Sequence, residues 1–162
     1  MTGNEAAKQS VTRPDWDEIW MNVALELSRR STCLSRKVGA VIIGEDNQVI
    51  AWGYNGALRG EPHCTKCARE GIPPGQRLDL CRGIHAEQNA IDVAARHGIS
   101  TLGATLYLTH YPCTYCAKSI IQAGITALVF RDDYPNPLAK EVLRALTQRC
   151  ISHGEEKACD LP

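Results

Sequence analysis

Apolar residues recur at helical spacing in the first part of the chain and gather into short β-rich runs soon after it. The spacing predicts an amphipathic helix over residues 15–30. Its apolar members are Trp16, Trp20, Val23, Ala24 and Leu27. Two β-rich runs follow, over 38–43 and 48–52, and the polar residues 44–47 between them predict a β-hairpin.

The second half of the chain alternates between helical and strand-like patterns. Helical spacing predicts three helices, over 85–97, 113–123 and 137–148, and β-rich runs predict strands over 105–109 and 127–130. Such alternation is typical of an α/β fold, in which a partly parallel sheet is covered by helices on both faces.

Residues 53–84, between these two halves, contain many Gly, Pro and Cys residues and show no period. A structureless stretch of this length is uncommon in a compact domain unless something holds it in place. A length of 162 residues favours one domain. We therefore expect a single domain over 14–150 with a Cys-rich insertion over 56–84, and flexible tails over 1–13 and 151–162.

Charge and hydropathy exclude several classes of partner. The chain has 18 basic and 18 acidic residues, so it lacks the basic footprint of a protein that binds nucleic acid or an anionic membrane. No apolar run approaches the ~20 residues that a membrane span requires. The first 13 residues lack the apolar segment of a signal peptide, which favours a cytoplasmic protein. Eight cysteines in such a compartment indicate metal binding rather than disulfides.

Two short motifs combine metal ligands with a nearby carboxylate: HAE at 85–87 and PCTYC at 112–116. His85, Cys113 and Cys116 are three zinc ligands, and a catalytic zinc has three protein ligands and one open position for water. Glu87 is close in sequence but is not needed as a ligand. The pairing of H-x-E with P-C-x-x-C is the signature of zinc-dependent nucleobase deaminases.

The chemistry of deamination explains these residue types. Zinc lowers the pKa of bound water to roughly 7, and the resulting hydroxide can attack C4 of a cytosine ring. A general acid and base must then take the water proton, protonate the ring and deliver a proton to the leaving amine. Glu87 is the candidate for these transfers. The motifs also stand at the starts of two predicted helices, whose positive ends favour thiolates and a developing oxyanion.

The sequence resembles the deoxycytidylate (dCMP) deaminases of the cytidine deaminase-like superfamily, and within them the bacterial late-competence ComE-operon branch. The matching segments are VGAVII (38–43), GYNGALRG (53–60), CRGIHAEQNAI (81–91), TLYLTHYPCTYCAKSIIQAGI (105–125) and LVFRDDY (128–134). The resemblance implies a three-layer α/β/α fold around a mixed five-stranded sheet. It also implies a catalytic zinc on His85, Cys113 and Cys116, with Glu87 as proton shuttle.

The resemblance implies substrate contacts and regulation as well. Asn55 would hydrogen-bond the sugar, the backbone N–H of Ala86 would contact the pyrimidine O2, and Tyr134 would lie near the nucleotide. Members of this family are often hexamers, with dCTP and dTTP as allosteric effectors. No motif identifies the phosphate-binding residues, and Arg36, Lys37, Arg59 and Arg82 are candidates by charge alone.

Cysteines in the insertion suggest a second zinc. Cys64, Cys67 and Cys81 lie in a segment without regular structure, where a closed structural zinc can replace a missing core. By the family resemblance Cys33 completes a Cys33, Cys64, Cys67, Cys81 site, with His63 as an alternative ligand. A redox CxxC pair and metal-free core thiols are the other interpretations.

The leading functional hypothesis is hydrolysis of dCMP to dUMP and ammonia, which supplies dUMP for thymidylate synthesis. Deamination of another cytosine nucleotide or nucleoside, or of a tRNA adenosine, is an alternative with the same chemistry. A non-catalytic nucleotide-binding module with a deaminase-like fold is an alternative of a different class. The presence of Glu87 favours an enzyme over this binding module, because a binding module does not need a proton shuttle.

Overall fold

The structure is a computed structural model that describes residues 13–152 and 155–156. Its helices and strands follow one another as α1 (Trp16–Ser28), β1 (Gly39–Ile43), η1 (Glu45–Asn47), β2 (Val49–Tyr54), η2 (Leu78–Leu80), α2 (Ala86–Arg96), β3 (Thr105–His110), α3 (Thr114–Gln122), β4 (Ala127–Asp132), α4 (Pro137–Leu143), β5 (Thr147–Ser152) and β6 (Glu155–Glu156). The two predicted tails, 1–13 and 151–162, fall largely outside the described residues. Among the described residues, no helix is long and apolar enough to cross a bilayer.

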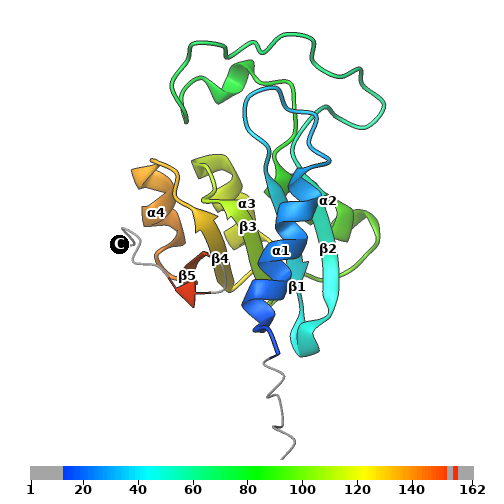
Figure 1. Ribbon diagram of the computed structural model, residues 1–162, viewed down its shortest axis with the longest axis vertical. Helices are drawn as coiled ribbons and strands as arrows, with labels where there is room; N and C mark the ends of the chain where they lie inside the picture. The colour runs from blue at the N-terminus through cyan, green and yellow to red at the C-terminus, as the bar shows by residue number, and fades with distance from the viewer. Residues whose placement is uncertain (1–12, 153–154, 157–162) are drawn as a thin grey trace, which may run out of the picture.

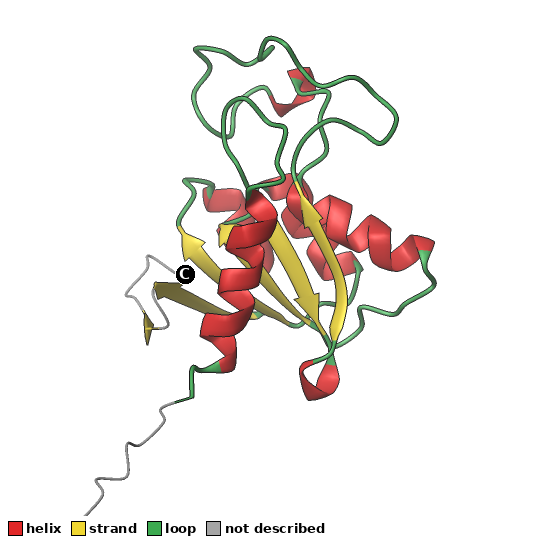
Figure 2. Cartoon of the chain, turned by 45° about the vertical axis from the view of Figure 1, so that its right-hand side comes forward, coloured by secondary structure: helices red, strands yellow, loops and turns green. Residues whose placement is uncertain are grey.

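A mixed sheet forms the centre of the fold, in the order β2-β1-β3-β4-β5, with the two-residue strand β6 added at the β5 edge. The β1–β2 hairpin is antiparallel, β1 is antiparallel to β3, and β3, β4 and β5 run parallel. The predicted three-layer α/β/α fold with a mixed five-stranded sheet is therefore confirmed. Figure 2 shows the strands between the helices that flank them.

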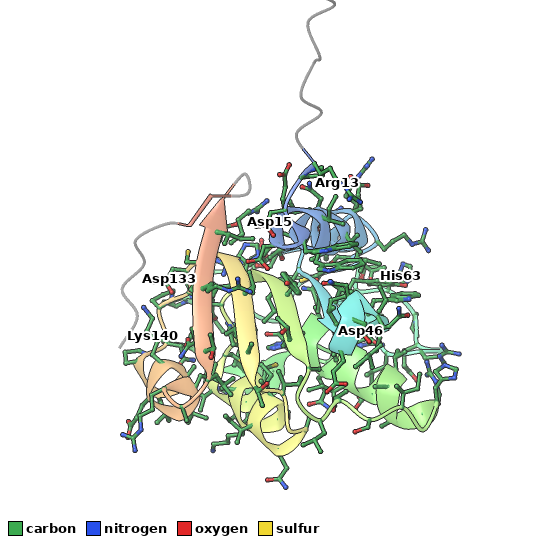
Figure 3. All side chains as sticks on the ribbon, turned by 90° about the horizontal axis from the view of Figure 1, so that it is seen from below. Arg13, Asp15, Asp46, His63, Asp133 and Lys140 are labelled. Carbon is green, nitrogen blue, oxygen red and sulfur yellow. The ribbon has the colours of Figure 1, made fainter. Side chains whose placement is uncertain are left out.

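The alternation of side chains along each strand divides the core into two layers. On one face Val41, Tyr107 and Val129 pack against α1, together with Met21 and Ala24 of that helix. On the other face the strands pack against α2, α3 and α4 through a second set of apolar residues. These strand residues are Ala40, Ile42, Leu106, Leu108, Leu128 and Phe130. Seen from below, α1 lies along one side of the sheet and the other three helices along the opposite side (Figure 3).

One predicted element is wrong. Helical spacing predicted a last helix over 137–148, but α4 ends at Leu143 and the chain continues as strand β5 from Thr147. In β5, Thr147 to Cys150 pair in register with Ala127 to Phe130 of β4. Without β5 the backbone of β4 would be an unpaired edge, so pairing between distant segments overrides the local helical pattern.

The insertion over 56–84 extends above one end of the sheet (Figure 1). It contains only the short helix η2 and a series of turns. A bridge between Gly56 and Ile84 closes its base, with backbone hydrogen bonds in both directions of 3.1 and 2.8 Å. The segment directly after this bridge is the start of α2, so the insertion is anchored beside the motif at 85–87.

Candidate active site

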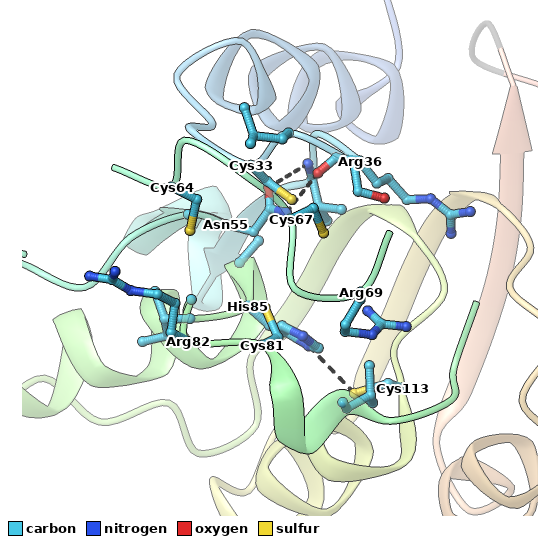
Figure 4. Close-up of a pocket in the computed structure, with 18 of the residues that line it drawn as sticks. Cys33, Arg36, Asn55, Cys64, Cys67, Arg69, Cys81, Arg82, His85 and Cys113 are labelled. Carbon is cyan, nitrogen blue, oxygen red and sulfur yellow. Dashed lines mark hydrogen bonds between the residues drawn. The ribbon is translucent and has the colours of Figure 1, made fainter. Parts of the chain in front are cut away.

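The starts of α2 and α3 bring the three predicted zinc ligands together. His85 is the N-cap of α2 and Cys113 the N-cap of α3, while Cys116 lies in the first turn of α3. His85 Nδ1 lies 3.5 Å from Cys113 Sγ and 3.3 Å from Cys116 Sγ (Figure 4 draws the first of these contacts). The three donor atoms all lie within 4.8 Å of one another.

These distances fit a tetrahedral zinc. Zinc–nitrogen bonds of about 2.05 Å and zinc–sulfur bonds of about 2.3 Å at a tetrahedral angle separate nitrogen from sulfur by roughly 3.5 Å. The side chains therefore already stand where a bound ion would hold them. One imidazole and two thiols, with no fourth ligand gathered beside them in the described part of the chain, are the donor set of a catalytic site that keeps a position open.

The thiols and the imidazole modify one another's protonation. The hydrogen bond from the Cys116 thiol lowers the pKa of Cys113 from its usual range, and the contact with His85 lowers it further, although burial opposes both. The hydrogen bond between the two cysteine side chains raises the pKa of Cys116, and burial raises it further. The hydrogen bond with Cys113 raises the pKa of His85. One of the two sulfurs therefore ionises readily, and thiolate is the form that ligates metal.

Glu87 lies in the first turn of α2 and is only 5 % exposed. Burial raises the pKa of this carboxyl above its ordinary value, while the nearby His85 opposes the shift. Its side chain also hydrogen-bonds that of Cys116. A carboxyl that is buried beside the metal ligands and holds its proton more strongly than usual suits a group that must both accept and donate a proton.

A cavity of about 250 Å³ opens above these groups. Its wall includes residues from the α1–β1 loop, the end of β3, the segment after β4 and, in large part, the insertion. The insertion residues in the wall are Gly56, Ala57, Cys64, Lys66, Cys67, Ala68, Arg69, Ile72, Pro74, Leu78, Leu80, Cys81, Arg82, Gly83 and Ile84. The insertion therefore forms part of the wall of the active site. The sequence did not predict this role, because the insertion shows no hydrophobic period.

The predicted substrate contacts all line this cavity, but Asn55 is already engaged by the fold. Its Oδ1 accepts from Ser31 Oγ (2.7 Å) and from the Val38 N–H (2.8 Å). Its Nδ2 donates to the Arg36 carbonyl at 2.7 Å. One amide N–H is left for a ligand, since the side chain carries two. Asn55 therefore holds the loop before β1 in position, whatever it contributes to binding.

Ala86 and Tyr134 occupy different parts of the wall. Ala86 is fully buried at the first position of α2, where a backbone N–H has no partner within the helix. Tyr134 lies two residues past the end of β4, and the Arg36 guanidinium carbon is 5.1 Å from the centroid of its ring. The pairing of Arg36 with Tyr134 joins residues nearly a hundred positions apart and has no signal in the sequence.

The four remaining cysteines of the predicted second site also line the cavity (Figure 4). Cys33, Cys64, Cys67 and Cys81 carry free thiols. Within the described part of the chain, however, the His85 trio is the only group of three potential ligands gathered within 4.8 Å. Cys150 in β5 is disulfide-bonded, so the expectation that the cysteines serve metals rather than disulfides is wrong for this residue.

Comparison with known sequences identifies the family. Residues 14–132 match the cytidine and deoxycytidylate deaminase zinc-binding region, a segment that includes both motifs. The chain belongs to this family of zinc-dependent deaminases. The zinc site on His85, Cys113 and Cys116 is the family's metal centre.

Two curated relatives illustrate the range of similarity. ComE operon protein 2 of Bacillus subtilis is 45 % identical over 132 residues, which cover 80 % of this chain and 67 % of the relative. The deoxycytidylate deaminase of Schizosaccharomyces pombe is 39 % identical over 126 residues, or 75 % of this chain. The match spans only 38 % of that longer protein.

A solved structure matches the whole fold. The dCMP deaminase of cyanophage S-TIM5, crystallised in complex with dCMP and dUMP, superposes with a TM-score of 0.74 at 29 % identity. The match covers 86 % of this chain and 99 % of the phage protein.

Proposed function

We propose that this protein is a dCMP deaminase, which hydrolyses dCMP to dUMP and ammonia and so supplies dUMP for thymidylate synthesis. The observation that carries the proposal is Glu87, the one carboxylate in the cavity wall, buried next to three ligands arranged for zinc. Relatives that bear the name deoxycytidylate deaminase, and the phage enzyme crystallised with dCMP and dUMP, support this choice of substrate.

Each group in the wall has a defined task in this reaction. Zinc, when bound by His85, Cys113 and Cys116, supplies an activated water at neutral pH. Glu87 takes one proton from that water and passes it to ring N3 as the oxygen adds to C4. It then takes the second proton from the new C4 hydroxyl and passes it to the amino group, which leaves as ammonia when the C4–N bond breaks. The Ala86 N–H, at the positive end of α2, donates to the pyrimidine O2.

The remaining contacts orient the nucleotide. The free N–H of Asn55 donates to the sugar, and Tyr134 flanks the nucleotide on the side of the Arg36 loop. Because the insertion forms much of the wall, it also restricts the access of bulk water, which strengthens electrostatic interactions inside the cavity.

The test is an ammonia-release assay of zinc-replete protein on dCMP, CMP, deoxycytidine, dCTP and a tRNA anticodon stem. Turnover of dCMP well above the other four supports the proposal. Preferential turnover of another member of the panel identifies a different deaminase. No turnover on any of them, with zinc bound and dUMP still binding, would indicate the non-catalytic binding module.

We also propose a second, structural zinc on Cys33, Cys64, Cys67 and Cys81. All four thiols are free and line one cavity, and they belong to segments without regular structure that need an anchor. Metal analysis should find two zinc ions per chain in the wild type and one in Cys67→Ser. A wild type with one zinc per chain would contradict this site.

A hexameric assembly and regulation by dCTP and dTTP complete the proposal, and both rest on the family resemblance. Light scattering measures the mass of the assembly. The same deamination assay, repeated with each effector, should show activation by dCTP and inhibition by dTTP. A monomer without response to either nucleotide would remove both parts.

A further inference from the structure

The cavity wall is strongly positive although the chain as a whole has no net charge. Four Lys or Arg side chains line it, namely Arg36, Lys66, Arg69 and Arg82. Among the described residues, the one acidic side chain in the wall is that of the buried Glu87. In a chain with 18 basic and 18 acidic residues this excess is local, and it fits an anionic part of the ligand.

Two of these four cations are poorly placed to bind a ligand. Arg82 is exposed and is paired with Glu61 at 3.3 Å, with a second bond to the Pro62 carbonyl. Lys66 is exposed on the insertion. In Figure 4, Arg82 lies on one side of His85, while Arg36 and Arg69 lie on the other side.

Arg36 and Arg69 are half-buried, and neither forms an ion pair within 4.0 Å of a described carboxylate; the nearby Asp79, which acts on Arg69, is itself paired with Arg77. Arg69 donates to the carbonyls of Gln76 (3.0 Å) and Pro73 (3.5 Å), which hold its guanidinium without cancelling its charge. The guanidinium of Arg36 stacks over Tyr134, and within the described residues no acidic oxygen lies within 4.0 Å of it. Arg36 is therefore a positioned cation with an open hydrogen-bonding edge.

The backbone and the surroundings of Arg36 are also fixed. Its carbonyl accepts from Asn55 Nδ2, so its loop is tied to the end of β2. Its positive charge also acts on His110. The pKa of His110 is lowered mainly by burial and further by Arg36, while Asp132 opposes the shift. His110 directly precedes the segment that carries Cys113. Arg36 thus belongs to the cavity wall, with its guanidinium held over the ring of Tyr134, which also lines the cavity.

We propose that Arg36, held over the ring of Tyr134, binds the 5′-phosphate of the nucleotide and makes the site select a nucleotide over a nucleoside, with Arg69 as the second cation. The proposal rests on the proposed deaminase function and names the residue that reads the substrate's charge. A planar guanidinium donates two parallel hydrogen bonds to a phosphate. The aromatic ring restricts the side chain before the ligand arrives, which reduces the entropy lost on binding.

The test is the ratio of kcat/KM for dCMP to that for deoxycytidine. Arg36→Gln should lower this ratio on the order of 10- to 100-fold, mainly through KM for dCMP, because charge-assisted bonds to phosphate are lost. Turnover of deoxycytidine and zinc content should stay at the wild-type level. Lys37→Gln is the matched control: this exposed neighbour does not line the cavity, and its substitution should leave the ratio unchanged.

Variants of Tyr134 test whether the aromatic ring must hold the Arg36 guanidinium in place, or whether the charge of Arg36 alone is sufficient. Tyr134→Phe keeps the ring and should keep the ratio, whereas Tyr134→Leu should lower it several-fold. Calorimetry with dUMP and deoxyuridine, on the same zinc-loaded proteins, measures the phosphate preference without any turnover.

The outcomes distinguish this proposal from the proposed function. A wild type that handles deoxycytidine and deoxyuridine as well as dCMP and dUMP overturns the nucleotide substrate and this proposal together. A nucleotide preference that survives in Arg36→Gln overturns this proposal alone. An equal loss on both substrates would assign Arg36 a structural role and would equally overturn it.

Discussion

Gly53 offers a direct test of how the zinc site depends on helix packing. It lies in β2 beneath the first turn of α2, where an added Cβ would be 2.6 Å from the Ala90 nitrogen and closer still to the Ala86 carbonyl. Ordinary contact begins at about 3.4 Å. In Gly53→Ala the helix and the strand must therefore separate by about 0.8 Å or more. The backbone of Gly53 needs no special φ, so crowding is the only cause of the effect.

The size of this movement sets the expected loss. Zinc sites tolerate deviations of about 0.2 Å in ligand distance, and α2 carries His85 while α3 carries the two cysteines. A misplacement of about 1 Å can cost 10²-fold in rate. We expect zinc affinity at least ~10-fold weaker, kcat/KM lower on the order of 10²-fold, and about 1–3 kcal/mol less stability from overpacking.

The assay is competition for zinc with a chromophoric chelator, alongside thermal unfolding and deamination of dCMP. Gly44→Ala is the matched control, because its new Cβ would meet only the flexible end of Ile50, 2.8 Å away, far along the hairpin from the metal. If folded Gly53→Ala binds zinc and turns over like the wild type, then β2 moves instead of α2, and the packing of this glycine does not set the ligand geometry.

Three further predictions follow from individual contacts. Glu87→Gln should lower kcat by about 10³- to 10⁴-fold while zinc content and dUMP affinity are retained, and normal turnover would remove Glu87 as the proton shuttle. Asp17→Ala should destabilise the fold by about 2 kcal/mol in urea unfolding. The reason is that Asp17 accepts a hydrogen bond from the Tyr107 hydroxyl (2.7 Å) and forms an ion pair with Arg149 (2.6 Å). An unchanged unfolding midpoint would mean that water replaces both contacts. Removal of zinc by a chelator should abolish turnover and lower the melting temperature, and added zinc should restore both, whereas activity that survives with less than 0.1 zinc per chain would exclude the metal from the reaction.

Local pattern was sufficient for most of the fold. The periodicity of residues 15–30 and the β-rich runs around 44–47 correspond to α1 and the β1–β2 hairpin. It failed at β5, where helical spacing continues past Leu143 although the chain becomes a strand. The partner of that strand, β4, lies some twenty residues away, and such pairing depends on which sheet edge is open rather than on the residues themselves.

The catalytic groups could be predicted from the sequence because each motif is short and lies at the start of a helix. Spacing of two residues links His85 to Glu87, and spacing of three links Cys113 to Cys116, so each pair is held by one turn of its own helix. The chemistry of these side chains then indicates zinc and proton transfer. Only the tertiary structure determined that His85 Nδ1 lies within 3.5 Å of both sulfurs, because the packing of α2 and α3 on one sheet face sets that distance.

The substrate-facing wall was decided by the tertiary structure alone. Arg36 was one of several cations that the sequence could not rank, and Arg69 had no distinguishing signal. Their positions result from a loop before β1, a residue after β4 and an irregular insertion that meet above the metal ligands. Contacts between such distant segments depend on the arrangement of the sheet and leave no periodic trace in the chain, whereas metal ligands on a single helical turn do.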